Sequence, residues 1–346
     1  MKKIIISSLI LAALSCGLLA GCNGGIGSHD HDYGKWTVTV QPTCTEKGTR
    51  ERTCSICNHV EVKEADPLPH AFNLENVCGD CGLTLSYSTG LSYELTADGK
   101  SYVLTGVGSC LDANIVLPYA YEGKLVTEVK ERAFVGSAIT SFTAQNSLKT
   151  IGKSAFNESK LKSVYLCDSV EEIESFAFAF CSSLETVRLS ENLKTLNDIF
   201  YSCSALKEVE LGSKLTEIAS LAFFECASLE ELYLPSSVTK IGARAFSGCE
   251  GLKTIGVPAG VTVIENGLFV NCTSLRRVTF FGKPQKFCMD LFMACKKLDT
   301  VVYGGTVKEF QKTERERLWE GDVDTGRFTV QCTNGKLTFE EVRSGE

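Results

Sequence analysis

The chain has 346 residues, 44% of them hydrophobic, and its 42 acidic and 35 basic side chains give a formal charge of −7 at pH 7. This acidic balance disfavours nucleic acid as a partner, because binding to a phosphate backbone depends on clustered lysine and arginine. All four histidines lie before residue 71, so the long remainder offers no histidine for a catalytic triad or a histidine-based metal site.

Residues 1–21 have the pattern of a secretory signal peptide. Two lysines precede an apolar run from Ile4 to Ala20, as in secretory signals. The run ends in Leu-Ala-Gly before Cys22, which resembles a lipobox and implies cleavage before Cys22 and lipidation of that residue. An ordinary signal peptide followed by an incidental cysteine is the alternative. Residues 22–35 are then expected to form the lipid anchor and a flexible tether, on a mature chain of formal charge −9.

Residues 36–85 form a separate cysteine-rich segment. The pairs Cys54/Cys57 and Cys78/Cys81 are separated by 20 residues, a spacing typical of zinc ribbons, in which four thiolates hold one zinc ion. Alternating valines on either side of the first pair predict two short strands. We therefore expect a small two-stranded, zinc-ribbon-like module with one structural zinc. Disulfides, which an extracytoplasmic location favours, and free or catalytic thiols are the alternatives.

The longest part of the chain is repetitive, with a phenylalanine every 22 or 23 residues. The eight members of this ladder are Phe134, Phe156, Phe178, Phe200, Phe223, Phe246, Phe269 and Phe292. Leucine, isoleucine and valine recur at fixed distances from each of them, which is the signature of leucine-rich repeats. One unit has too few apolar side chains to fold alone, so we expect stacked turns that share one core and pair their strands in parallel.

Two features vary along the repeats. Six turns carry a cysteine three residues after the phenylalanine: Cys181, Cys203, Cys226, Cys249, Cys272 and Cys295. A small, weakly polar thiol suits a crowded position, so these cysteines are expected to be buried and reduced. The unit at Asn197–Phe200 is one residue short and has Ile199 where several other units have alanine, which predicts a local irregularity.

With its flanks, from about residue 86 to 342, the repeat region resembles the BspA-like leucine-rich repeat family of bacterial surface proteins. The entry segment Leu91-Ser-Tyr-Glu-Leu95 and the exit segment Val302-Tyr-Gly-Gly-Thr306 carry part of this resemblance. It implies a leucine-rich repeat solenoid, rich in parallel β-structure with little helix, of about eight turns over residues 86–304. A C-terminal cap is expected over residues 305–346.

The predicted C-terminal cap contains a helix and a hairpin. Thr306 and Glu309 have capping-box spacing, which predicts a helix through about Leu318 whose Val307 and Phe310 cover the end of the core. Asn334-Gly335 is a favoured two-residue turn between a strand around Val330 and a return strand that contains Leu337 and Phe339.

The predicted function is binding rather than catalysis. Outward-facing strand positions include Tyr165, Arg188 and Tyr233, residue types enriched at interface hot spots, so they are candidate ligand-binding residues; ordinary solvent-facing side chains are the alternative. No paired carboxylates facing a cleft and no phosphate-binding glycine loop are visible, so no catalytic residue, small-molecule substrate or cofactor of the repeats is expected.

The resemblance implies a lipid-anchored protein of the bacterial cell surface or outer envelope. Its repeats would bind extracellular or envelope proteins, including host matrix or plasma proteins. The alternative is a structural or glycan- and peptidoglycan-binding component of the envelope that has no host ligand.

Overall fold

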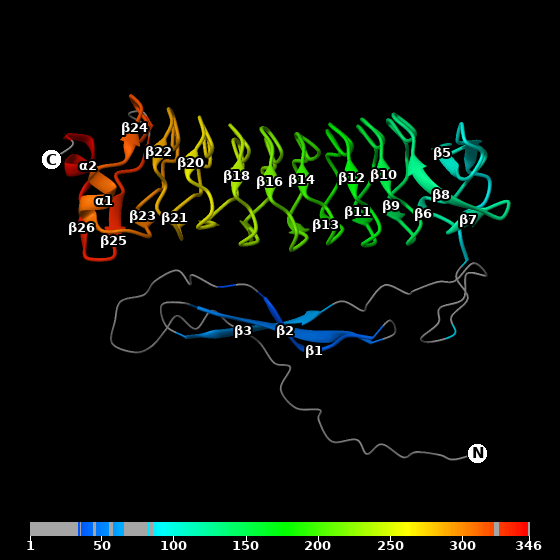
Figure 1. Ribbon diagram of the computed structural model, residues 1–346, viewed down its shortest axis with the longest axis horizontal. Coiled ribbons are helices and arrows are strands. Elements are labelled where there is room, and N and C mark those ends of the chain that lie inside the picture. The colour runs from blue at the N-terminus through cyan, green and yellow to red at the C-terminus, as the bar shows by residue number, and fades with distance from the viewer. Residues whose placement is uncertain are drawn as a thin grey trace, which may run out of the picture. The chain divides into compact units, whose positions relative to one another are not determined.

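The computed structural model describes residues 34, 36–43, 46–54, 58–65, 82, 86–321 and 325–344 (Figure 1). The chain divides into two compact units, Met1–Leu68 and Pro69–Glu346. The predicted signal peptide, the lipidation site Cys22, most of the tether and the predicted zinc ligands Cys57, Cys78 and Cys81 lie outside the described residues. These expectations therefore stay predictions.

In the first unit, the described residues form a three-stranded antiparallel sheet. Its strands, in spatial order, are β1 (Thr37–Val40), β2 (Gly48–Thr53) and β3 (Val60–Ala65). The sequence predicted only two strands, because β2 carries charged residues instead of an apolar alternation. Its Arg52 lies 4.6 Å from the centre of the Trp36 ring and pairs with Glu61 at 2.6 Å. Polar cross-strand pairs therefore hold this sheet together.

The second unit is a parallel β-solenoid of about nine turns, one more than the phenylalanine ladder predicted (Figure 1). Its strands run in two tracks, and the extra turn arises because residues after the ladder extend both tracks. The first track consists of β6 (Asn114–Val116), β9 (Ser141–Thr143), β11 (Ser163–Tyr165), β13 (Thr186–Arg188), β15 (Glu208–Glu210), β17 (Glu231–Leu232), β19 (Thr254–Val257), β21 (Arg277–Phe280), β23 (Thr300–Tyr303) and β25 (Thr329–Cys332). The second track consists of β8 (Lys124–Val129), β10 (Thr150–Ile151), β12 (Glu172–Ile173), β14 (Thr195–Leu196), β16 (Glu217–Ile218), β18 (Lys240–Ile241), β20 (Val263–Ile264), β22 (Lys286–Phe287) and β24 (Glu314–Arg315).

At its N-terminal end the solenoid is closed by short strands. They are β4 (Ser92–Leu95), which pairs antiparallel with β5 (Tyr102–Gly106), and β7 (Ala120–Tyr121), which forms a hairpin with β8. Strand β5 in turn pairs parallel with β8. The second track therefore begins on an antiparallel hairpin instead of an open edge.

The phenylalanine ladder forms the centre of the solenoid core. Neighbouring rings stack with centroids 5.0 to 6.0 Å apart and interplanar angles of 7° to 28°. All eight side chains are at most 1% exposed. Trp319 closes the C-terminal end of the ladder, 5.0 Å from Phe287 and 6.3 Å from Phe292. Each ring thus contacts apolar groups of both neighbouring turns, which makes the stacked turns interdependent.

The predicted irregularity at Asn197–Phe200 is present. Strand pairing in the second track is interrupted between β12 and β14, and also between β18 and β20, where no residue is missing, so the irregularity is seen in the hydrogen bonds rather than in the interruption itself. In regular turns the backbone N–H of Gly152 donates to Val129, and that of Ala219 to Leu196, at 2.8 and 2.7 Å. In the short turn the side-chain amide of Asn197 donates to the carbonyl of Ile173 at 2.9 Å. A side chain therefore bridges the interval that the missing residue creates.

The C-terminal cap confirms the capping box but not the helix length. Thr306 Oγ1 accepts from the Glu309 N–H, and the Glu309 carboxylate accepts from the Thr306 N–H. The helix α1 (Val307–Gln311) buries Phe310 and half-buries Val307, as predicted. It ends well before Leu318, because Glu314–Arg315 pairs as a strand with β22.

The hairpin of the cap also differs in detail from the prediction. Strand β25 pairs antiparallel with β26 (Gly335–Leu337), but Gly335 already pairs with Cys332, so the two-residue turn is Thr333–Asn334. Phe339 starts the helix α2 (Phe339–Ser344) instead of continuing the strand. The Thr338 backbone N–H donates to the Glu341 carboxylate at 2.6 Å, a helix-start contact that the sequence analysis missed.

Candidate functional site

The outward side chains of the first track form one continuous surface, here called the strand face. Tyr165 on β11 is in register with Thr143 on β9 and Arg188 on β13, and Arg188 is in register with Glu210 on β15. Val164 and Val187, which alternate with them, are 3% exposed and belong to the core. The alternation of inward and outward residues expected from the sequence is therefore observed on these strands.

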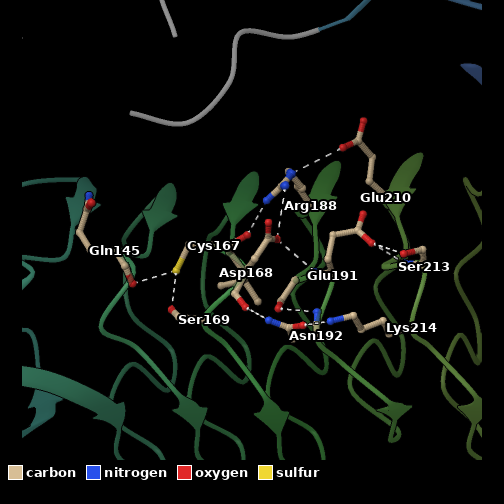
Figure 2. Close-up of polar contacts among 12 residues, drawn as sticks. Gln145, Cys167, Asp168, Ser169, Arg188, Glu191, Asn192, Glu210, Ser213 and Lys214 are labelled. Carbon is tan, nitrogen blue, oxygen red and sulfur yellow. Dashed lines mark hydrogen bonds and ion pairs between the residues drawn. The ribbon is translucent and has the colours of Figure 1, made fainter. Parts of the chain in front are cut away.

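Tyr165 and Arg188, two of the predicted ligand-binding residues, contact each other. The Arg188 guanidinium lies 5.0 Å from the Tyr165 ring centre, within cation–π range. It also donates to the carbonyl of Leu166 at 2.8 Å and lies 3.4 Å from Asp168 and 4.0 Å from Glu210 (Figure 2). Arg188 is thus held by its neighbours in one orientation, a rigid and partly covered cation.

Burial alters the Tyr165 phenol. It raises the pKa of Tyr165 to about 12, with Arg188 opposing this shift. The hydroxyl oxygen is buried and makes no hydrogen bond in the part of the chain that the structure describes. Tyr165 therefore presents its ring rather than its hydroxyl.

The third predicted residue, Tyr233, lies apart from this pair. It follows β17, beyond the interruption of the first track between β15 and β17, and is 43% exposed. A second exposed aromatic residue is Phe281, which follows β21. Its ring extends over Gly256 on β19, so closely that a Cβ atom added to Gly256 would lie 2.5 Å from the ring. Phe281 is 58% exposed. Tyr233 and Phe281 therefore lie on either side of Gly256 on the strand face.

Phe281 was not predicted from the sequence, because the residue lies just beyond the end of β21 and outside the outward positions that recur in every turn. The signal that could have revealed it is Gly256, which occupies an outward strand position where other turns have larger side chains. A glycine inside a strand often marks the close approach of another group.

Carboxylates dominate the middle of the strand face. Glu208, Glu210 and Glu231 are exposed at outward positions of β15 and β17. The arginines of this surface, Arg188 and Arg277, are half-buried. At the outward strand positions near Tyr233, exposed carboxylates therefore outnumber exposed arginines.

A polar network borders the strand face on the loops that follow β11, β13 and β15 (Figure 2). The Asp168 carboxylate accepts from the Glu191 N–H at 3.1 Å, and the Glu191 carboxylate accepts from the Ser213 N–H at 2.7 Å and from its hydroxyl at 2.6 Å. Asn192 donates to the Asp168 carbonyl and accepts from Lys214 at 2.7 Å. Each bond joins neighbouring turns, so the network fixes the border of the face.

The cysteine column is a buried structural feature. All six thiols are 0% exposed, and each donates to the backbone carbonyl of the ladder phenylalanine one turn earlier, at 2.9 to 3.3 Å. Burial raises the pKa of Cys181 to about 11 and that of Cys249 to about 12. Cys181 and Cys249 are therefore protonated at neutral pH, and all six thiols are buried away from any substrate, whereas an activated nucleophile is an accessible thiolate.

Of the four predicted zinc ligands, only Cys54 belongs to the described residues. It is buried at the start of the loop between β2 and β3, where its N–H donates to the carbonyl of His59 at 2.8 Å and its carbonyl accepts from Asn58 at 2.9 Å. A buried thiol on a hairpin loop is a suitable zinc donor. The described residues contain no cluster of three or more histidine, cysteine, aspartate or glutamate side chains suited to a metal ion.

None of the described helices has the length and apolar character needed to cross a membrane.

Comparisons with known proteins agree with the solenoid geometry. A family model described as "BspA type Leucine rich repeat region" matches residues 114–199 and 197–314, with six copies. No curated protein matches the chain.

Several solved structures are similar to the chain. The leucine-rich repeat protein TpLRR of T. pallidum has 29% identity over 60% of this chain and 88% of that one, with a TM-score of 0.44. A leucine-rich repeat protein from Bacteroides ovatus has 23% identity over 72% and 78%, with a TM-score of 0.46. A leucine-rich cell surface protein from Faecalibacterium prausnitzii has 18% identity over 72% and 96%, with a TM-score of 0.38.

Proposed function

The chain belongs to the BspA-type leucine-rich repeat family, and on that premise we propose that it is a bacterial surface protein that binds extracellular proteins through its strand face. The observation that carries this proposal is the pair of exposed aromatic side chains, Tyr233 and Phe281, on either side of Gly256. Large aromatic side chains held on a rigid sheet lose little conformational entropy when a partner covers them.

The charge of the strand face defines the complementary partner. Exposed Glu208, Glu210 and Glu231 lie on the strands that lead to Tyr233. A partner surface with lysine or arginine around an apolar centre would match them, because complementary charge increases the association rate and selects the partner. Tyr165 and Arg188 add a second, preorganised contact point on the same face.

Two further parts of the proposal concern the segments before the solenoid. We place a lipid anchor on Cys22, because the apolar run before it ends in a lipobox-like sequence, and several acyl chains hold a protein on a membrane stably. If Cys22→Ala still incorporates labelled fatty acid in cells, the anchor assignment is wrong.

We also propose one structural zinc on Cys54, Cys57, Cys78 and Cys81, supported by their spacing and by the loop position of Cys54.

Binding to immobilised extracellular matrix proteins, plasma proteins and peptidoglycan would test the strand face. The double variant Tyr233→Ala/Phe281→Ala is expected to weaken binding to a protein of this panel at least tenfold. Val263→Ala changes an exposed side chain on the second track and should leave that affinity unchanged. Equal affinity of the double variant and the wild type would rule out this face, and binding to peptidoglycan alone would favour an envelope component without a protein ligand.

A further inference from the structure

A second cluster of aromatic side chains lies outside both the core and the strand face. It consists of Phe176, Phe180, Tyr201 and Phe224, from three successive turns, and is here called the aromatic patch. Tyr201 stacks on Phe224 at 4.8 Å and contacts Phe180 at 5.4 Å and Phe176 at 6.0 Å. Phe180 is 46% exposed and the other three are half-buried. The rings therefore form one continuous apolar surface in contact with water.

The backbone under the patch is unfavourable for phenylalanine. In most turns the residues two before and two after the ladder phenylalanine have positive φ. Other turns place residues of several kinds there: glycine or asparagine, which tolerate this left-handed conformation, at Gly136, Gly248, Gly267 and Asn271, but also larger residues such as Arg132 and Leu221. In one turn both positions are phenylalanine: Phe176 has φ 60° and Phe180 has φ 58°.

Burial accounts for Phe176, which is half-buried and contacts Tyr201, better than for Phe180. The exposed Phe180 ring contributes little burial, although its backbone is held at positive φ. Phe180 therefore indicates a role other than stability.

The column of positions that contains Phe180 has acidic residues at both ends, in the order Glu158, Phe180, Ser202 and Glu225; the exposed lysines nearest in sequence to Glu158 are Lys153 and Lys160. Within two residues of the ladder phenylalanines Phe156, Phe178, Phe200 and Phe223, the charged residues are Glu158, Asp198 and Glu225. Glu158 and Glu225 are exposed, and the Glu225 carboxylate accepts from the Ser202 hydroxyl next to Tyr201 at 2.8 Å. Arg244 belongs to the turn after that of Phe224. Its side chain lies against Gly267 of the next turn again, and so is directed away from the patch.

We propose that the aromatic patch is a docking site for a basic, amphipathic protein segment. The apolar side chains of that segment would pack against Phe180 and Tyr201, and its lysines or arginines would approach Glu158 and Glu225 and the ring faces. A symmetric contact with a second copy is disfavoured, because it would bring two acidic borders together on chains of formal charge −7. This site is separate from the strand face and does not depend on the function proposed for it.

Fluorescence anisotropy with the full chain and a labelled synthetic peptide tests the proposal. The peptide carries leucine on one helical face and lysine on the other, and a second peptide with glutamate in place of lysine is the charge control. The lysine peptide is expected to bind, and Phe180→Ser and Tyr201→Ser should each weaken it at least tenfold. Val263→Ser makes a comparable change at an exposed apolar residue of the second track, outside both proposed sites, and should leave the affinity unchanged.

Other outcomes would overturn the proposal. If Phe281→Ser rather than Phe180→Ser abolishes binding, the peptide binds the strand face. The partner is not a basic segment if the two peptides bind equally well or if a neutral oligosaccharide competes with the lysine peptide. If the wild type forms a dimer and Phe180→Ser does not, the patch is instead a contact between two copies of the chain.

Thermal unfolding separates docking from a structural role. Phe180→Gly is expected to keep or raise the melting temperature while it abolishes peptide binding, because glycine relieves the left-handed backbone at this position. A clear fall in melting temperature would show that the ring serves folding, and the proposal would then be wrong.

Discussion

At the residue scale, the cysteine column shows how one small side chain meets two demands. The side chain at this position is fully buried and faces the backbone carbonyl of the ladder phenylalanine one turn earlier. The thiol fits the space and donates a weak hydrogen bond to the carbonyl, while its low polarity makes burial inexpensive in free energy. Alanine would fill less of the space and leave the carbonyl without this donor.

The raised thiol pKa values of the cysteine column predict that the protein becomes less stable at alkaline pH. Because burial raises the pKa of Cys181 to about 11 and that of Cys249 to about 12, the folded state binds these protons more tightly than the unfolded state. The associated stability is complete below the unfolded thiol pKa of about 9 and is lost as pH rises from about 9 towards 12. Denaturant unfolding measured at pH 8 and pH 10.5 should therefore show a lower midpoint at pH 10.5.

Alkylation provides the accompanying check. At pH 8 the six thiols of the column should stay unmodified in the native protein, whereas half-buried Cys332 should react sooner. Rapid native labelling of the column by an impermeant reagent, followed by mass mapping, would contradict this placement.

At the element scale, the sequence predicted what repeats and missed what depends on a distant partner. The 22- or 23-residue period predicted the stacked turns, and the short unit at Asn197 predicted the local irregularity at which a side-chain amide takes the place of a backbone donor. The capping box predicted where α1 begins but not where it ends, because its end depends on pairing with β22. Strand β2 was missed for the same reason, since cross-strand charge pairs replace apolar alternation there.

In the candidate sites, too, the sequence predicted the features that depend on the repeat and missed those that depend on contacts between turns. Repeat alignment could place Tyr165 beside Arg188, since both occupy one outward position. It could not show that the Phe281 ring lies across Gly256. Phe176 and Phe180 were missed because both flank Phe178 in an alternating alanine–phenylalanine run that looks like core; only the fold shows that the outer two rings contact solvent.

The C-terminal cap should weaken in acid through Glu309. An ion pair with Lys283 and hydrogen bonds from Thr306 lower the pKa of Glu309 to about 2. A lowered pKa contributes stability that is present above the unfolded value of about 4.3 and is lost as pH falls from about 4.3 to about 2. The emission of Trp319, in a Trp36→Phe background, should therefore change over this range.

Substitution isolates this effect. Glu309→Gln should remove most of the acid-dependent change, while Glu340→Gln, outside the capping box of α1, should retain it. An identical acid profile for Glu309→Gln and its parent would show that this carboxylate does not control the cap.

At the scale of the whole molecule, the chain combines two units that are stabilised differently. The solenoid has a continuous apolar core closed by Trp319, whereas the described part of the first unit depends on polar pairs around Trp36. The two tryptophans, the only ones in the chain, therefore report on one unit each.

This division gives a direct test of the proposed zinc. A chelator such as EDTA should alter the emission of the wild type but not that of Trp36→Phe, because metal loss unfolds small zinc modules and leaves the solenoid core intact. Metal analysis should find near one zinc per chain before treatment. If a thiol reductant produces the change and EDTA does not, disulfides hold the module instead.

One shared interior, built around the phenylalanine ladder, holds the turns of the solenoid together. The most direct measurement compares the free energy of unfolding of Phe223→Ala and Phe281→Ala, which delete the same side chain at 0% and 58% exposure. The structure predicts a loss of about 3–5 kcal/mol for Phe223→Ala and at most about 0.5 kcal/mol for Phe281→Ala. Equal, small losses for both variants would contradict the shared core.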